Sequence, residues 1–216
     1  MLKKLPLEAV TIDGYGTLLQ LVDPVPNLQE ALLKTGADVS VERIKRAFHA
    51  EVAYYRPRSH KGNSKATLEK LRRECVDVFI KDLGLGIDPD AFVDIFIEAL
   101  KFGLIPGALN ALDNLQELGL KLACVANWDI GLHEELERLN VANYFDIVIT
   151  SAEAGSPKPD TAIFNLALSA MNVTAIKTVH IGDEDLDLQG ARNAGLQFEP
   201  IPLSTLPSRL TKKMLL

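Results

Sequence analysis

The chain has 216 residues, of which 47% are hydrophobic and 24% charged, and its formal net charge is −6 at pH 7. These values are ordinary for a globular protein, and the length allows one large domain or two modest ones. The acidic balance argues against a nucleic-acid partner, because a phosphate backbone attracts a basic face. No apolar run approaches the roughly 20 residues that span a bilayer, so we expect no membrane partner. Two cysteines in apolar stretches and the lack of a signal-peptide pattern indicate a cytoplasmic protein.

The elements expected along the chain fall into two regimes. A short β-branched segment, residues 7–12, predicts a strand that ends at a glycine-rich turn. Helical periodicity then extends from about residue 26 to residue 102, with no strand expected there, and it predicts helices over residues 27–34, 41–55, 65–83 and 89–102. From residue 105 onward, helices are expected over residues 108–118, 132–139, 161–171 and 188–194. They alternate with strands expected over residues 121–126, 145–150, 178–181 and 197–201.

Repeated strand–helix units predict a parallel sheet covered by helices on both faces. The first strand most simply joins that sheet, so the expected fold class is α/β, with an α-helical cap inserted into the core. The core is then residues 1–21 and 105–216, and the cap is residues 22–104.

Side chains that follow the expected strands are candidates for chemistry, because ligands bind beyond the C-terminal ends of parallel strands. Asp13 follows the first strand, Asn127 the second, and Lys158 lies between two prolines after the third. The fourth strand is followed by an acidic loop that contains Asp183 and Asp187. Clustered carboxylates raise one another's pKa unless a cation compensates them, and hard oxygen ligands suit Mg²⁺. A strand-end aspartate beside Mg²⁺ is a credible nucleophile toward phosphorus, and a nearby lysine keeps it ionised.

Four segments in this order resemble the motifs of the haloacid dehalogenase superfamily. They are Asp13–Leu18 (DGYGTL), Ala126-Asn127, Gly155–Pro159 (GSPKP) and His180–Gly195 (HIGDEDLDLQGARNAG). The resemblance implies a hydrolase with a Rossmann-like core and a helical C1-type cap, in which Asp13 is the nucleophile and Lys158 the third-motif lysine. It also implies that Mg²⁺ is held by Asp13, the backbone carbonyl of Tyr15, Asp183 and Asp187.

Two positions depart from the family pattern. Tyr15 stands where phosphatases of the superfamily usually carry a second aspartate, which protonates the leaving group. A phenol with a pKa of about 10 is a poor general base at neutral pH, so the catalytic role of Tyr15 stays open. Ala126 stands where the family normally has Ser or Thr, whose hydroxyl binds a phosphoryl oxygen. Losing one such donor costs on the order of 10²–10³ in rate, so both departures predict a slow phosphatase.

Substrate contacts are expected from Asn127 and Thr17 near the nucleophile and from Arg56 and Arg58 in the cap. Residues 54–61 are rich in side chains that bind anions. The alternative for this segment is a helix C-terminus that carries cations, and the alternative for Thr17 is a structural hydroxyl in the turn.

The leading hypothesis is a Mg²⁺-dependent phosphatase that acts on a small phosphorylated metabolite through an aspartyl-phosphate intermediate. The alternative enzyme is a 2-haloacid dehalogenase, because these metal-independent enzymes also carry the DxYGTL form. They lack the paired fourth-motif acids that this chain keeps as Asp183 and Asp187. A phosphoacceptor or binding module without turnover is the third alternative, and either a monomer or a homodimer is compatible with the sequence.

Overall fold

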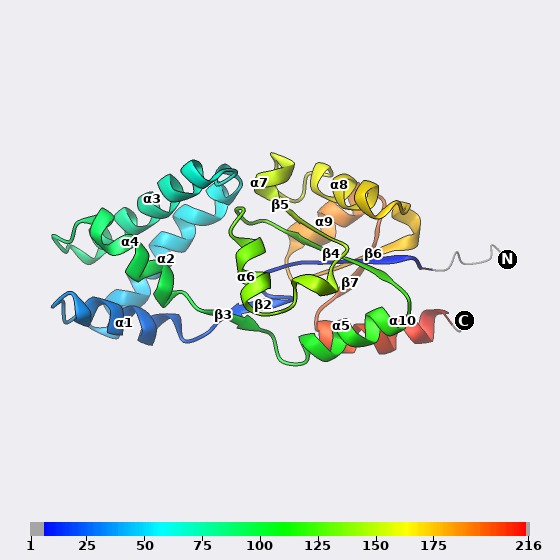
Figure 1. Cartoon of the computed structure of the whole chain (residues 1–216), viewed down its shortest axis with the longest axis horizontal. Helices are drawn as coiled ribbons and strands as arrows, with labels where there is room; N and C mark the ends of the chain where they lie inside the picture. The colour runs from blue at the N-terminus through cyan, green and yellow to red at the C-terminus, as the bar shows by residue number, and fades with distance from the viewer. Residues whose placement is uncertain (1–6, 215–216) are drawn as a thin grey trace.

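The computed structural model describes residues 7–214 as two lobes joined at one end of a sheet (Figure 1). The larger lobe is built on a five-stranded sheet in the order β5-β4-β1-β6-β7, and all four neighbouring pairs are parallel. Its strands are β1 (Ala9–Ile12), β4 (Lys121–Ala126), β5 (Ile147–Thr150), β6 (Thr178–Gly182) and β7 (Gln197–Pro200). The expected α/β fold with a Rossmann-like parallel sheet is therefore confirmed.

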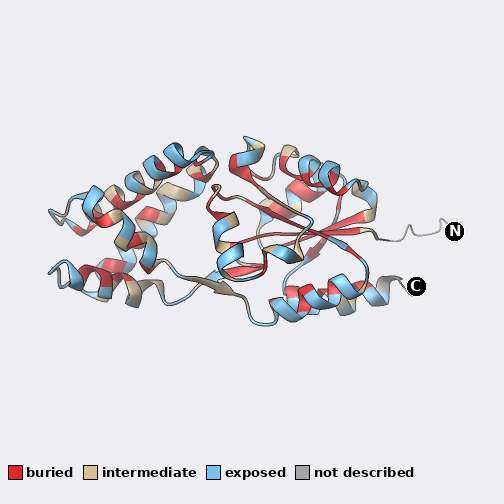
Figure 2. Ribbon diagram, viewed as in Figure 1, coloured by how far each residue is buried: buried red, intermediate tan, exposed pale blue. Residues whose placement is uncertain are grey.

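Helices cover both faces of this sheet, which is why the central strand β1 is buried throughout (Figure 2). Successive side chains of a strand point to opposite faces. Val10 and Ile12 therefore belong to one apolar cluster, and Ala9 belongs to the other. The first cluster includes residues of α5 (Ala108–Glu117), α6 (Leu132–Arg138) and α10 (Leu206–Met214). The second includes residues of α8 (Ala162–Met171) and α9 (Asp185–Asn193).

The smaller lobe consists of helices only, and residues 24–99 are called the helical insert below. Its elements are α1 (Pro24–Lys34), α2 (Val41–Tyr55), the 3₁₀ helix η1 (Arg56–Lys61), α3 (Lys65–Leu83) and α4 (Pro89–Ala99). It has its own apolar core, in which the rings of Phe79, Phe92 and Phe96 lie 5.0–6.5 Å apart. The ends of α3 follow local rules, since Ser64 caps its N-terminus and Gly84 adopts the left-handed conformation after its last turn. The ranges expected for α2 and α3 coincide with those observed.

The two lobes are joined by a feature that the sequence did not predict. β2 (Leu19–Leu21) pairs antiparallel with β3 (Phe102–Leu104) at the junction. The sequence interpretation placed Phe102 at the end of a helix and expected no strand nearby. That expectation was wrong because three-residue strands carry no readable periodicity, and the pairing joins residues about 80 positions apart.

Several short or terminal elements were also not expected. They are α7 (Ser151–Ala154), α10, and the 3₁₀ helices η2 (Ala142–Tyr144), η3 (Ala175–Lys177) and η4 (Leu203–Thr205). Within residues 7–214, no helix combines the length and the apolar character needed to cross a membrane. Cys75 in α3 and Cys124 in β4 are buried and form no disulfide, as expected.

Candidate active site

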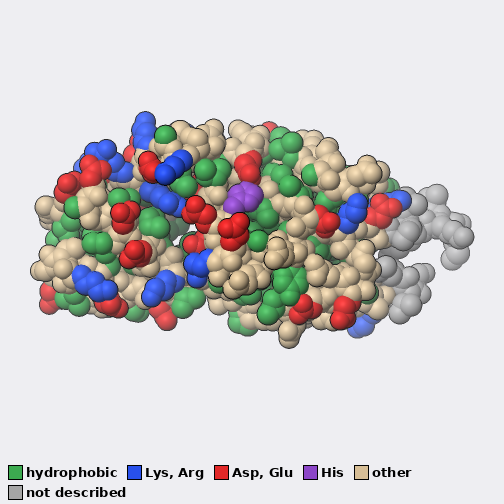
Figure 3. All heavy atoms as spheres, viewed as in Figure 1, with side chains coloured by type: hydrophobic (Ala, Val, Ile, Leu, Met, Phe, Trp, Pro, Cys, Tyr) green, Lys and Arg blue, Asp and Glu red, His purple; other side chains and the backbone are tan. Residues whose placement is uncertain are grey.

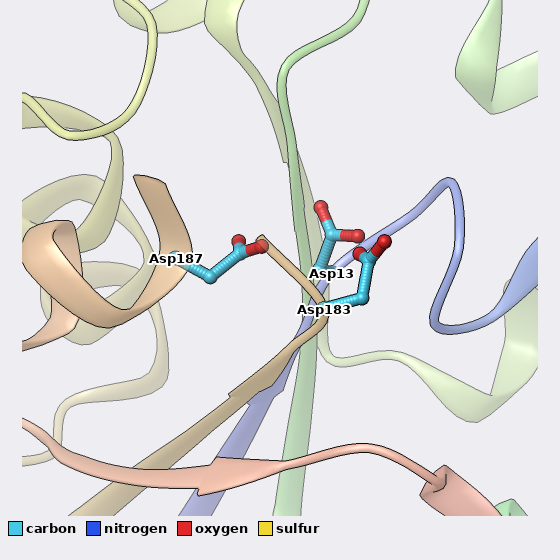
Figure 4. Close-up of side chains that lie close together, drawn as sticks. All are labelled: Asp13, Asp183 and Asp187. Atoms are coloured by element: carbon cyan, nitrogen blue, oxygen red, sulfur yellow. The ribbon is translucent and has the colours of Figure 1, made fainter. Parts of the chain in front are cut away.

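Three carboxylates converge at the C-terminal edge of the sheet (Figure 4). Asp13 follows β1, Asp183 follows β6, and Asp187 lies in the first turn of α9. Because β1 and β6 are parallel neighbours, their ends meet, and the Asp13 backbone N–H donates to the Ile181 carbonyl over 3.0 Å. One carboxylate oxygen from each aspartate lies within 4.8 Å of the others. The sequence expectation that these residues come together is met by this geometry.

The Lys158 ammonium lies among these acids. Its Nζ donates to Asp13 Oδ1, to Asp187 Oδ1 over 2.6 Å and to the Val125 carbonyl over 3.0 Å. Lys158 is 4% exposed, and three acceptors match its three N–H groups. The ammonium is therefore held in one position between Asp13 and Asp187.

The Asn127 side chain holds the backbone of Lys158. Its Oδ1 accepts from the Lys158 N–H over 2.7 Å, and its Nδ2 donates to the Lys158 carbonyl over 3.2 Å. Asn127 also lines the cavity described below. The expected substrate contact of this residue stays a prediction, whereas its positioning of Lys158 is a finding that the sequence did not predict.

Thr17 and Gly16 position Asp183. The Thr17 hydroxyl donates to Asp183 Oδ1 over 3.3 Å, and Thr17 is 1% exposed and lies outside the cavity lining. The structure thus does not place Thr17 on the cavity wall, where a substrate contact had been expected, but against an acid of the site. Gly16 has φ +93°, and a Cβ there would lie 2.3 Å from Asp183 Oδ2. Only glycine leaves room for the observed position of the Asp183 carboxylate.

His180, to which the sequence gave no role in the site, supports Asp187. It lies fully buried in β6, with Nε2 3.0 Å from Asp187 Oδ1 and Nδ1 2.9 Å from Thr11 Oγ1. A neutral ring that donates from Nε2 to the carboxylate accepts the Thr11 hydroxyl at Nδ1. One feature of the sequence could have pointed to this role of His180. A polar residue in a strand that is buried at every position needs a hydrogen-bonding partner.

The ionisation of these groups reflects burial and mutual charge. Burial raises the pKa of Asp13 to about 7, and the Asp187 and Asp183 charges act in the same direction against Lys158. Burial alone would raise the pKa of Asp187, but hydrogen bonds from His180 and Lys158 and the Lys158 charge hold it well below its usual range. Burial and the neighbouring carboxylates raise the pKa of Asp183.

This set of residues fits a hard divalent cation. In the part of the chain that the structure describes, Asp13, Asp183 and Asp187 form the group of acidic side chains close enough to share an ion. Three carboxylates face one ammonium, so a divalent cation would balance their charge, and oxygen-only ligands suit Mg²⁺. The ligand role expected for the Tyr15 carbonyl stays a prediction.

A cavity of about 810 Å³ lies between the sheet edge and the helical insert. On the sheet side its walls include Asp13, Tyr15, Ala126, Asn127 and Lys158. On the insert side they include Phe48, Glu51, Val52, Tyr55 and Leu71. Figure 3 shows charged side chains of both signs, with a histidine, gathered where the two lobes meet. This volume is that of an ordinary small-molecule site.

Aromatic rings form part of the wall next to Asp13. Tyr15 is 52% exposed and packs edge-on against Phe102 at 6.5 Å, and Phe102 packs against Trp128 at 5.0 Å. Tyr15 therefore lines the cavity from the position where the family usually has an acid. Ala126 also lines the cavity, and its methyl side chain has no hydroxyl that could bind a phosphoryl oxygen.

Of the two arginines expected to bind substrate, only Arg56 lines the cavity. Its guanidinium donates to Glu184 of the core, so it connects the helical insert to the loop after β6. Arg58 donates to the Tyr54 carbonyl over 2.8 Å and lies 4.0 Å above the Tyr54 ring. The structure therefore does not bring Arg58 to the site.

The insert meets the core through a further set of bonds that the sequence did not reveal. The Tyr55 hydroxyl donates to Asp129 Oδ2 over 2.7 Å, and the Ile130 N–H donates to the Gly62 carbonyl over 3.1 Å. Asp129 also accepts from the Gly131 N–H over 2.8 Å. These bonds hold the insert over the open edge of the sheet.

Comparison with known proteins shows the family to which this chain belongs. Residues 40–199 match the family described as Haloacid dehalogenase-like hydrolase. The chain is 30% identical over 209 residues to Haloacid dehalogenase-like hydrolase domain-containing protein 3 of Mus musculus, which covers 91% of this chain and 82% of that protein. It is 35% identical over 123 residues to the ribulose-1,5-bisphosphate 5-phosphatase of Halopiger xanaduensis. That match covers 55% of this chain and 49% of the relative, so the aligned region spans about half the relative's length.

Solved structures share the fold. A putative beta-phosphoglucomutase from Thermotoga maritima superposes with a TM-score of 0.74 over 95% of this chain and 99% of that one. The two sequences are 18% identical, so this similarity concerns the fold alone.

Proposed function

Because the chain belongs to the haloacid dehalogenase-like hydrolase family, we propose that it is a Mg²⁺-dependent phosphatase of a small phosphorylated metabolite. The observation that carries this proposal is Asp183, the third carboxylate beside Asp13 and Asp187. Displacement at carbon needs a nucleophile and a nearby lysine, and a third acid would only repel the other two. With a divalent cation, the same acid becomes a ligand.

The reaction proposed begins with Asp13. Lys158 engages Oδ1, so Oδ2 is the oxygen available to attack phosphorus. The new oxygen–phosphorus bond forms while the ester bond breaks, and the alcohol oxygen leaves with the electron pair and takes a proton. Water then attacks the aspartyl-phosphate, inorganic phosphate departs, and the Asp13 carboxylate is restored. The Lys158 ammonium stabilises the charge at the phosphoryl group.

Asp13, Asp183 and Asp187 would hold Mg²⁺ in this proposal. When bound, the ion would supply positive charge that offsets the carboxylates and the phosphoryl oxygens. Thr17 and His180 would keep two of those acids in position through the bonds described above.

The proton that the leaving group needs has no acid at the usual position. Tyr15 faces the cavity in place of that aspartate, and a phenol transfers a proton less readily at neutral pH. We therefore expect faster turnover of esters whose leaving groups depart without protonation.

The helical insert would act as the cap of this phosphatase. Under this proposal the core is residues 1–21 and 105–216 and the cap is residues 22–104, with the cavity between them as the substrate chamber. The name of the Halopiger xanaduensis relative supports a small phosphorylated substrate. Two buried cysteines without a disulfide support a cytoplasmic location.

The experiment is hydrolysis of para-nitrophenyl phosphate with Mg²⁺ or with EDTA. We expect Mg²⁺-dependent release in the wild type and a loss of at least about 10⁴-fold in Asp13→Asn, because the nucleophile is removed. Asp185→Asn is the matched control, since Asp185 is an exposed acid of the same edge, and it should retain activity.

The competing activity is 2-haloacid dehalogenation, which Tyr15 and the apolar part of the cavity favour. It predicts chloride release from 2-chloropropionate in EDTA and no phosphate release under either condition. That pair of results would overturn the phosphatase proposal.

A further inference from the structure

On the insert side of the cavity one acid is buried among apolar side chains, although the cationic side chains Lys45 and Arg72 also line this cavity. Glu51 of α2 lines the cavity and is only 5% exposed. Phe48 and Val52 lie on the same helix beside it, and Leu71 belongs to the facing wall of α3. A carboxyl in such a place has lost its water without entering an ion pair, because no Lys, Arg or His side chain described in residues 7–212 pairs with it.

The described residues give the Glu51 carboxyl a weak hydrogen-bonding partner. Its hydrogen-bonding neighbour is the Cys75 thiol of α3, and a thiol is a weak donor. Burial raises the pKa of Glu51 to about 7. A buried polar group with one weak partner on the wall of a cavity is typical of a group that binds a ligand.

Besides Asp13 and Asp187, which share Lys158, three other acids line the cavity, and each has a strong partner. Asp129 accepts from the Tyr55 hydroxyl and the Gly131 N–H. Glu184 pairs with Arg56, and Glu135 accepts from Arg138 over 2.7 Å. Glu51 differs from these acids, because the Cys75 thiol is the partner that the described residues give it and its carboxyl keeps acceptor capacity beside the cavity.

We propose that Glu51 is a specificity-determining residue that binds a hydrogen-bond donor on the organic part of the substrate. The substrate is then a phosphate ester with an apolar body that carries a hydroxyl or an ammonium group. The apolar side chains around Glu51 select the body, and the carboxyl selects the donor. This inference rests on the proposed phosphatase function, since it places the phosphate at Asp13 and the organic part against the insert.

The test uses alkyl phosphates of three to six carbons whose far end is a methyl, a hydroxyl or an ammonium group. We expect the best donor-bearing ester to exceed its methyl counterpart in kcat/KM by about 10–100-fold in the wild type. In Glu51→Leu, which fills the site with an apolar side chain, the ratio should fall to within about threefold. The hydroxyl and ammonium series show which donor is preferred.

Glu42→Gln is the matched control, because Glu42 is an exposed glutamate of the same helix. It should keep the wild-type ratio. Glu51→Gln is the second variant, in case Glu51→Leu does not fold, and folding is checked by circular dichroism. Because the amide retains an acceptor but not the charge, it should weaken a preference for ammonium at least about tenfold and a preference for hydroxyl much less.

The inference is overturned if the wild type treats the matched esters alike, or if the preference survives in Glu51→Leu. Failure of the proposed function has a different signature, namely no phosphate release from para-nitrophenyl phosphate. In that case calorimetric binding of the matching alkylphosphonates with Mg²⁺ decides, and equal affinity for the methyl and donor-bearing compounds overturns the inference.

Discussion

The two walls of the cavity bury carboxyl groups in opposite ways. On the sheet side, Asp13 and Asp187 share the Lys158 ammonium, and His180 donates a further bond to Asp187. On the insert side, the hydrogen-bonding partner that the described part of the chain gives Glu51 is the Cys75 thiol. Groups that must act on a reacting centre are held by one another, whereas a group left with a weak partner is available to a ligand. Under the two proposals above, chemistry takes place at the sheet edge and the helices select the substrate.

Removing an acid from the sheet side should have the largest effect. Asp183→Asn takes away one of three carboxylates that converge there, so we expect kcat/KM with Mg²⁺ to fall on the order of 10³-fold. Mn²⁺ binding, followed by electron paramagnetic resonance, should weaken in parallel. Asp185→Asn serves as control and should change neither quantity more than about threefold. Unchanged Mn²⁺ affinity in Asp183→Asn would contradict the ion site.

Replacing Glu51 by a neutral residue should change how the free energy of unfolding depends on pH. The direction is opposite to that for an acid held in an ion pair, because burial raises the pKa of Glu51 whereas an ion pair lowers the pKa of an acid. Burial raises the pKa of Glu51 from 4.5 to about 7, so the folded state keeps its proton while the unfolded chain loses it. The stability contributed by Glu51 is complete below pH 4.5 and is lost as the pH rises to about 7. Relative to wild type, Glu51→Gln should therefore gain on the order of 3 kcal/mol in unfolding free energy between pH 4.5 and 7.

Urea unfolding of both proteins across this pH range measures that difference. Glu42→Gln is the exposed control, and its unfolding free energy should stay within about 0.5 kcal/mol of wild type throughout. A flat difference between Glu51→Gln and wild type would show that Glu51 is ionised in the folded protein.

Adding a donor to the sheet side should have the smallest effect of the three. Ala126→Ser places a hydroxyl on the cavity wall next to Asn127, where the family normally has one. We expect kcat for para-nitrophenyl phosphate to rise about tenfold, less than the full value of a preorganised donor, because nothing holds the new hydroxyl. Ala142→Ser, remote from the cavity, should leave kcat unchanged. A decrease in Ala126→Ser would mean that this wall has no place for a hydroxyl.

Local patterns predicted most of the fold. The helical periodicity of α2 and α3, the apolar run of β4 and the β-branched residues of β6 each lie within a single segment, so neighbouring residues encode them. The β2–β3 ribbon was not predictable in this way, because each strand has three residues and its partner lies far away in the sequence. The packing of η1 likewise decides that Arg56 lines the cavity and that Arg58 lies over the Tyr54 ring.

Local patterns in the chain are enough to predict the α/β class and the helical insert. They also predict the order in which Asp13, Lys158, Asp183 and Asp187 reach one sheet edge. Parallel strands must end at the same edge, so the position of an acid after a strand already places it there. Which of these side chains pair, in contrast, depends on how the elements pack in space. The Thr17–Asp183 contact spans 166 positions and the Lys158–Asp13 contact 145, and no local pattern encodes such distances. The same holds for Glu51, because the absence of an ion pair to it among the described residues depends on every element packed around it.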